Sequence, residues 1–171
     1  LNIASCVLPP PNDICANAFD IVCNTPLNGT TAGASTDPIP FCGTTQSGGS
    51  VWYSFIGTGE FVIATATSQV NTNLSIYTGA SCGLLSCVTG DAGFPNSEAF
   101  FQGNLGQQYW VMVHADNTAG SFTVNLECIP PPANDGPCGA EDVPLVAGVG
   151  SVTFSNVGAT ADVDEVSPGP G

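Results

Sequence analysis

The sequence of 171 residues offers few side chains for acid–base or nucleophilic chemistry. Its single histidine lies in His114-Ala-Asp116, a spacing that would let a carboxylate orient an imidazole as a general base. However, the chain has no Gly-x-Ser-x-Gly nucleophile elbow, and it has neither Lys nor Arg to stabilise an oxyanion. We therefore predict that the protein is not an enzyme and that His114 is a structural residue at a strand end.

The acidic side chains are candidate metal ligands, because calcium prefers oxygen ligands. The pairs Glu141-Asp142 and Asp164-Glu165 lack the spaced Asp-x-Asp-x-Asp pattern of a calcium loop. We therefore interpret them as solvated turn acids and predict no cofactor and no resident metal. If calcium does bind, the better candidates are the loop acids Asp13, Asp37, Asp91 and Asp116.

The charge balance excludes several classes of partner. With no Lys or Arg, 14 acidic residues and a formal charge of −14, the chain has nothing to neutralise phosphate, so nucleic acid and anionic membranes are excluded. No apolar run approaches the roughly 20 residues of a membrane helix, so membrane insertion is not expected. The hydrophobic content of 43% is enough for a folded core.

Eight cysteines in a chain of this size indicate an oxidising compartment, so we expect an extracellular or cell-surface location. No Cys-x-x-Cys zinc pattern is present, which favours disulfides. One pairing scheme joins Cys82–Cys87, Cys23–Cys42 and Cys15–Cys128, and leaves Cys6 and Cys138. The competing scheme closes each proline segment with its own bridge, Cys6–Cys15 and Cys128–Cys138.

One stretch of the chain occurs twice. Cys6-Val-Leu-Pro-Pro-Pro-Asn-Asp-Ile-Cys15 recurs as Cys128-Ile-Pro-Pro-Pro-Ala-Asn-Asp-Gly-Pro-Cys138, and Gly33-Ala-Ser-Thr-Asp37 recurs as Gly158-Ala-Thr-Ala-Asp162. A repeat of this length indicates an array of domains. We expect the end of a preceding repeat with a proline linker at 1–11 and a complete domain at 12–128. A second proline linker follows at 129–133, and 134–171 is a partial next repeat or a donor-strand tail.

Alternating apolar residues predict β-strands, and no segment shows a sustained helical period. The strongest is Ser50-Val-Trp-Tyr-Ser-Phe-Ile56, with Val51, Tyr53 and Phe55 on one face. The other expected strands are 16–23, 60–67, 73–78, 97–102, 108–114 and 121–127, with a tight hairpin over 82–87 and a loop over 90–95. Strands of this length between turn signals predict an all-β fold, a disulfide-bonded antiparallel sandwich of the jelly-roll type with an extended C-terminal β segment.

The order of motifs resembles a known family. Asn12-Asp-Ile-Cys15, Val51-Trp-Tyr-Ser-Phe55, Leu74-Ser-Ile-Tyr-Thr-Gly79, Gly106-Gln-Gln-Tyr-Trp-Val-Met-Val-His114 and Gly120-Ser-Phe-Thr-Val-Asn-Leu126 are similar to secreted repeat domains related to the bacterial pre-peptidase C-terminal domain. The resemblance covers residues 12–128 and, in its opening part, 134–162. It implies a jelly-roll module with an accessory or adhesive role. Members often carry two Asp after the second hairpin cysteine, but Cys87-Val-Thr-Gly-Asp91 has one, so the resemblance adds no calcium site.

Two further patterns concern sugars. Asn28-Gly-Thr30 and Asn73-Leu-Ser75 match the N-glycosylation acceptor, which requires surface exposure. Several aromatic residues could form a platform that stacks on a glycan, although on alternating strands such residues more often belong to a core or a packing contact. These candidates are Trp52, Tyr53, Tyr77, Tyr109 and Trp110.

These features favour an extracellular structural module whose partners are copies of itself, joined head-to-tail into a filament or adhesive surface fibre. The tail 134–171 lacks a counterpart of the Val51–Phe55 strand, so its apolar residues need cover, and adding its strands to a neighbour would supply it. A disulfide between Cys138 of one copy and Cys6 of the next would lock the contact. The alternative is a carbohydrate-binding or adhesion module with glycan partners. The tail residues concerned include Val143, Leu145, Val152, Phe154 and Val157.

Overall fold

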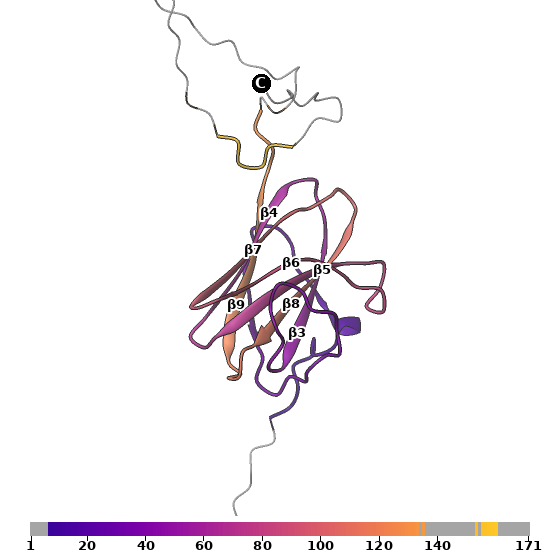
Figure 1. Ribbon diagram of the computed structural model, residues 1–171, viewed down its shortest axis with the longest axis vertical. Coiled ribbons are helices and arrows are strands. Elements are labelled where there is room, and N and C mark those ends of the chain that lie inside the picture. Colours follow the sequence, from indigo (N-terminus) through magenta and orange to yellow (C-terminus); the bar gives the residue numbers. More distant parts are fainter. Residues whose placement is uncertain (1–6, 134, 136–152, 154, 161–171) are drawn as a thin grey trace, which may run out of the picture.

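The computed structural model describes residues 7–133, 135, 153 and 155–160, in which two β-sheets pack face to face (Figure 1). A 3-10 helix, η1 (Cys15–Asn17), precedes the first strand, and no helix in these residues is long and apolar enough to cross a membrane. The strands are β1 (Phe19–Asp20), β2 (Leu27–Thr30), β3 (Ser50–Ile56), β4 (Phe61–Ser68), β5 (Thr72–Thr78), β6 (Ser86–Gly93), β7 (Asn96–Gln102), β8 (Gln108–Ala115) and β9 (Ser121–Ile129).

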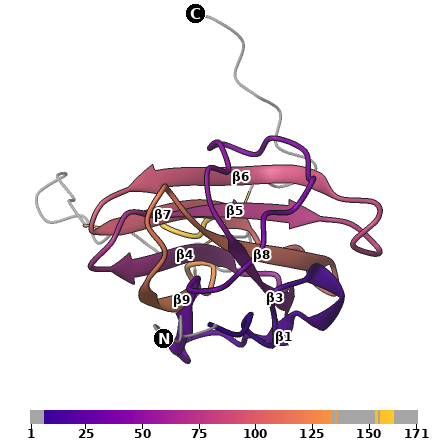
Figure 2. The ribbon, with the colours of Figure 1, turned by 90° about the horizontal axis from the view of Figure 1, so that it is seen from below.

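The sheet topology is that of a jelly roll. One sheet has the order β1-β3-β8-β5-β6 and the other has the order β2-β9-β4-β7, so the chain changes sheet at each connection from β2 to β9 except between β5 and β6 (Figure 2). The two-residue strand β1 pairs in parallel with β3, and the remaining pairs are antiparallel. The predicted fold class is confirmed, whereas most of the predicted C-terminal β segment lies outside the described residues.

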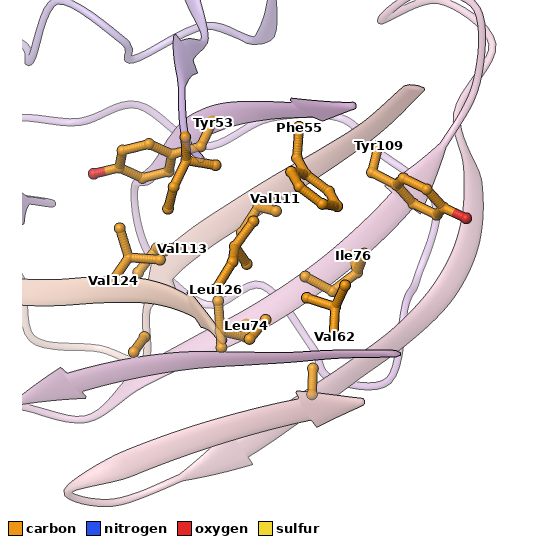
Figure 3. Close-up of a cluster of buried hydrophobic side chains, with 14 of the residues drawn as sticks. Tyr53, Phe55, Val62, Leu74, Ile76, Tyr109, Val111, Val113, Val124 and Leu126 are labelled. Atoms are coloured by element: carbon orange, nitrogen blue, oxygen red, sulfur yellow. The ribbon is translucent and has the colours of Figure 1, made fainter. Parts of the chain in front are cut away.

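The core lies between the two sheets. Val51, Tyr53 and Phe55 share one face of β3, as predicted, and this face lies in the core together with Phe122 and Val124 of β9. Tyr53, Phe55 and Val124 are shown in Figure 3. Tyr53 meets Phe122 edge-on, with ring centroids 6.4 Å apart. The period of two in these strands therefore separates core side chains from outward ones.

The outer faces of the two sheets differ. On the five-stranded sheet, Trp52, Tyr77 and Met112 are buried outside the main core, in a second cluster that includes Ile39 of the segment 36–49. As a result, β5 is buried on both faces over nearly all its length. On the four-stranded sheet, β4 alternates between buried and more exposed residues, so its outer face stays open.

Three predicted elements are wrong. The segment 16–23 holds only η1 and the two residues of β1, and residues 82–87 do not form a tight hairpin. The predicted loop 90–95 is wrong for residues 90–93, because β6 continues to Gly93. At Gly90 a Cβ atom would lie 2.2 Å from the carbonyl oxygen of Cys42, so only glycine fits in the strand at this position. The strand β2 was also missed. Its Asn28-Gly29 pair resembles a turn, but glycine is needed there because a Cβ would lie 2.4 Å from Cζ of Phe122.

Candidate interaction site

The proline linker is joined to the edge of the five-stranded sheet by Asn12. The Asn12 side-chain amide donates to the carbonyl oxygen of Trp52 (3.0 Å), and the Trp52 amide donates to the carbonyl oxygen of Asn12 (2.9 Å). Asn12 is buried, so both bonds are shielded from water. The linker therefore enters the domain at a fixed place beside β3.

The next residue, Asp13, holds a distant loop. Its carboxylate accepts hydrogen bonds from the amide of Ser35 (2.6 Å) and from the hydroxyl of Ser35 (2.9 Å). The amide of Asp13 itself donates to the carbonyl oxygen of Pro10 (3.1 Å), which closes a turn at the end of the proline run. We call this arrangement the first clamp.

The loop held by the first clamp lies against the residues before the prolines. Gly33 has φ of 78°, which favours glycine, and a Cβ there would lie 2.8 Å from the carbonyl oxygen of Leu8 and 3.0 Å from Cγ1 of Val7. The absence of a side chain at Gly33 therefore makes the room in which Val7 and Leu8 pass.

The same arrangement occurs again at the other end of the sandwich. The carboxylate of Asp135 accepts from the amide (2.9 Å) and the hydroxyl (2.6 Å) of Thr160, and the Asp135 amide donates to the carbonyl oxygen of Pro132 (3.0 Å). Gly158 has φ of 80°, and a Cβ there would lie 3.1 Å from the carbonyl oxygen of Pro130 and 3.2 Å from that of Ile129. We call this the second clamp.

The two clamps lie at opposite ends of the strand β9. Near the first clamp, the Thr31 amide donates to the carbonyl oxygen of Gly120, immediately before β9 begins at Ser121. The second clamp lies beyond Ile129, where β9 ends and the chain leaves the sandwich (Figure 1). The sequence repeat did suggest that the segments correspond. The sequence did not predict the hydrogen bonds between Asp13 and Ser35. Because both segments recur together, their recurrence was a signal that they could contact each other.

The cysteine pairing differs from both predicted schemes. The disulfides are Cys15–Cys82, Cys23–Cys128 and Cys42–Cys87. The predicted pairs Cys82–Cys87, Cys23–Cys42 and Cys15–Cys128 are therefore wrong, and so are Cys6–Cys15 and Cys128–Cys138. Proximity in sequence favoured Cys82–Cys87, whereas each observed bridge joins residues at least 45 positions apart. Cys6, Cys138 and the proposed bond between them lie outside the described residues.

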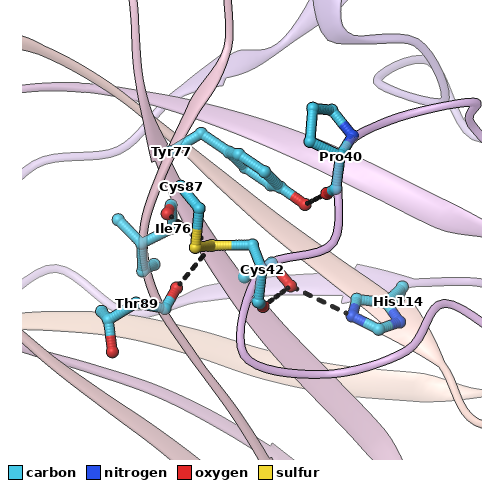
Figure 4. Close-up of a disulfide and its surroundings, with 8 residues drawn as sticks. Pro40, Cys42, Ile76, Tyr77, Cys87, Thr89 and His114 are labelled. Carbon is cyan, nitrogen blue, oxygen red and sulfur yellow. Dashed lines mark hydrogen bonds between the residues drawn. A yellow bond between two sulfur atoms is a disulfide. The ribbon is translucent and has the colours of Figure 1, made fainter.

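The disulfide Cys42–Cys87 fastens the covering segment 36–49 to β6 (Figure 4). The sulfur of Cys42 lies 3.2 Å from the carbonyl oxygens of both Ile76 and Thr89. The hydroxyl of Tyr77, in β5, donates to the carbonyl oxygen of Pro40 in the covering segment (2.9 Å). This bridge and hydrogen bond hold the segment against the sheet.

His114 is fully buried on the outer side of the five-stranded sheet. The Ser75 hydroxyl donates to the carbonyl oxygen of Cys42 (2.9 Å) and lies 3.4 Å from His114 Nε2, so Nε2 is the donor in that contact. Among the described residues, Nδ1 has no hydrogen-bond partner. Burial lowers the pKa of His114 to about 4, and the nearby Asp116 carboxylate opposes this shift. Such a neutral, inaccessible imidazole cannot reach a substrate in this conformation.

The four acidic candidates for calcium are separate and already bonded. Asp13 binds Ser35, Asp37 accepts from the Trp52 indole nitrogen (2.8 Å), Asp91 accepts from the Glu98 amide (2.9 Å) and Asp116 accepts from the Asn71 side chain (2.7 Å). In the described part of the chain, one group has metal-ligand spacing, namely Cys23, Glu60 and Cys128. Because its two sulfurs form a disulfide, they are not thiolate ligands.

The sugar-related candidates are mostly buried. Asn73 is 3% exposed within β5, so its acceptor nitrogen is not at the surface, whereas Asn28 is exposed and its side-chain oxygen accepts from the Thr123 hydroxyl. Four of the five candidate aromatic residues are buried, and the half-buried Trp110 donates its indole N–H to the carbonyl oxygen of Gly79. They therefore form no open platform. The buried four are Trp52, Tyr53, Tyr77 and Tyr109.

Of the predicted tail residues, Val157 is described, and it is 50% exposed. Its amide donates to the Ser155 hydroxyl in the loop of the second clamp. The other tail candidates lie outside the described residues: Val143, Leu145, Val152 and Phe154.

No family model matches the sequence, and no curated protein gives a significant match. Among solved structures, the chain is similar to the pre-peptidase C-terminal domain of a Bacillus anthracis collagenase, with 16% identity and a TM-score of 0.46, covering 64% of this chain and 94% of that one. It is also similar to a periplasmic inhibitor of g-type lysozyme from Aeromonas hydrophila, with 10% identity and a TM-score of 0.41, covering 64% and 96%. These likenesses concern the fold.

Proposed function

We propose that the protein is a non-enzymatic extracellular structural module that joins copies of itself head-to-tail, as a subunit of a filament or an adhesive surface fibre. The observation that carries this proposal is the recurrence of one clamp at both ends of the sandwich, through Asp13–Ser35 and Asp135–Thr160. A domain that enters and leaves by the same arrangement is suited to repetition along a line.

The placement of the two clamps favours an open assembly. A contact that joins the end of one unit to the beginning of the next is heterologous, and it gives a filament unless the rotation closes a ring. Because the clamps lie at opposite ends of β9, successive units extend away from one another. The proline runs add short, semi-rigid spacers.

The side chains that could do chemistry support a structural role. His114 is buried and neutral, and the carboxylates of Asp13, Asp37, Asp91 and Asp116 are engaged in hydrogen bonds within the domain. The three disulfides indicate an oxidising compartment outside the cytoplasm, which agrees with an extracellular or cell-surface position.

The composition also suits contacts between copies. Only 8% of residues are charged, so most polar surface is neutral and costs less to desolvate than ionised side chains. The formal charge of −14 opposes close approach at low ionic strength. We therefore expect assembly to be more favourable at physiological salt than in dilute buffer.

The test compares the full chain with a chain that ends at residue 138, by negative-stain microscopy and size-exclusion chromatography at 150 mM NaCl. We expect filaments from the full chain and a soluble monomer from the shortened chain. Filaments from the shortened chain, or a full chain that stays monomeric at high concentration, would overturn assembly through the tail. A glycan array on the same two samples tests the alternative, and specific glycan binding by both would favour a carbohydrate-binding module.

A further inference from the structure

We infer that each clamp is a rigid joint between two successive repeats. In this joint the end of the last strand of one repeat docks on the Gly-x-Ser/Thr loop of the next, and the bidentate bonds of the Asp carboxylate lock that loop in place. Val7 and Leu8 correspond to Ile129 and Pro130, the residues at the end of β9, by the sequence repeat. The docking surface is therefore the loop around Gly33, and its partner is the strand end of the preceding repeat. In both clamps the strand end and the loop that it docks on belong to one chain.

The first part of the joint is a close contact between a strand end and a glycine. In both copies a β-branched side chain precedes the prolines, and it lies against the glycine: Cγ1 of Val7 would be 3.0 Å from a Cβ at Gly33, and Cγ2 of Ile129 would be 3.4 Å from one at Gly158. Both glycines have nearly the same positive φ, 78° and 80°. The two loops therefore present the same surface to the strand end.

The second part is the bidentate lock. One carboxylate binds the amide and the hydroxyl of a single residue, and both serine and threonine provide that pair of donors. The two copies differ in residue type at this position, Ser35 in the first and Thr160 in the second, but both residues give the carboxylate the same two donors. The lock spans 22 positions in the first copy and 25 in the second, so it holds a distant loop against the linker in both.

The third part is the linker itself. Proline fixes φ near −65°, so Pro9 and Pro10, and their counterparts Pro131 and Pro132, leave few free dihedral angles between strand end and clamp. In both copies the Asp amide closes a turn onto the second of these prolines, at 3.1 Å and 3.0 Å. With the loop locked to Asp and the strand end seated on glycine, the direction of the next repeat is fixed.

Hydrogen–deuterium exchange measured by mass spectrometry on the full chain tests the joint, because it works on monomer and filament alike. We expect the peptide around Thr160 to be protected in the unaltered chain. Asp135→Ala should increase its exchange by about tenfold and leave the peptide around Ser35 unchanged, since one lock is lost. The matched control, Glu98→Ala, removes an exposed acid whose carboxylate makes no hydrogen bond within the described part of the chain, and it should change neither peptide.

A second variant tests the seat of the strand end. Gly158→Val places a side chain where Pro130 and Ile129 pass, so it should also deprotect the Thr160 peptide while the strands β3 to β9 keep their protection. Exchange at Thr160 that is already unprotected in the unaltered chain, or that neither variant changes, would overturn the joint. Because filaments are scored separately by microscopy, a failed joint and a failed assembly are distinguishable.

Discussion

The two clamps have the same local geometry, but their surroundings in the described residues differ. The first clamp is anchored to the sandwich, because Asn12 bonds with Trp52 of β3 and Cys15 forms a disulfide with Cys82. The second clamp has its own turn, glycine and bidentate bonds, and among the described residues it contacts the end of β9 and the proline linker. Each clamp is built from two short segments, and in the first clamp one of these segments is also joined to the sandwich through Asn12 and Cys15.

The largest expected effect tests the anchoring of the first clamp. Cys15→Ala with Cys82→Ala removes a bridge that closes 67 positions of sequence, and we expect the free energy of unfolding to fall by about 4 kcal/mol. Urea unfolding monitored by tryptophan fluorescence measures it, with the untouched disulfides checked by mass spectrometry. The protection of the Ser35 peptide in the remaining native state should persist. A loss of that protection at native conditions would show that the clamp depends on its anchor.

The sequence predicted the sandwich but not its cross-links. Alternation is a local property, so Val51, Tyr53 and Phe55 could be assigned to one face of the strand, but which face lies in the core between the sheets came from the structure. The disulfides depend on which loops cross the outer face of the five-stranded sheet. Cys15 is placed there by η1 and Cys42 by the covering segment 36–49, and no local pattern gives their partners Cys82 and Cys87.

The candidate site was predictable in part for a related reason. The recurrence of the Asn-Asp and Gly-Ala-Ser/Thr segments marked both ends of the clamp, but the contact between Asp13 and Ser35 is tertiary and had to be found in the structure. Gly29 and Gly90 show the opposite error. Each resembles a turn residue, yet each lies in a strand, where a Cβ would meet the Phe122 ring at Gly29 and the carbonyl oxygen of Cys42 at Gly90.

The next effect concerns the pH dependence of stability that arises from His114 of β8, which contacts Ser75 beneath the covering segment 36–49. His114 has a folded pKa of about 4, below its ordinary value of 6.5, so the unfolded chain binds a proton first as the pH falls. Stability from this group is complete above about pH 6.5, and it is lost progressively down to about pH 4, by roughly 3 kcal/mol in all.

Thermal unfolding of the unaltered chain and of His114→Gln between pH 7 and pH 4 measures that effect. Carboxylates titrate in both chains, so the difference between the two isolates the histidine. We expect the advantage of the unaltered chain to shrink as the pH falls. Parallel curves for both chains would mean that the pKa of His114 is the same in the folded and unfolded states.

A smaller effect compares the two glycine seats. Gly33→Ala should lower the free energy of unfolding by about 1–2 kcal/mol, because an L-residue at positive φ is strained and the new Cβ meets the backbone of Leu8. Gly158→Ala introduces the same strain outside the sandwich, so we expect a change in global unfolding below about 0.5 kcal/mol. Chemical denaturation of both variants decides this. Equal losses would mean that the second clamp unfolds together with the domain.

The smallest effect asks whether the two locks are interchangeable. Ser35→Thr puts the residue type of the second clamp into the first, at a position that is exposed to solvent. Both hydrogen bonds to Asp13 can be kept, so we expect the free energy of unfolding to change by less than about 0.5 kcal/mol. Ser35→Ala keeps the amide bond and loses the hydroxyl bond, which should cost about 1 kcal/mol. Denaturant titrations of the three chains therefore show whether the free energy of unfolding depends on keeping both hydrogen-bond donors or on having serine itself. If Ser35→Thr lowers the free energy of unfolding as much as Ser35→Ala does, the first clamp is specific for serine, and the two clamps are not interchangeable.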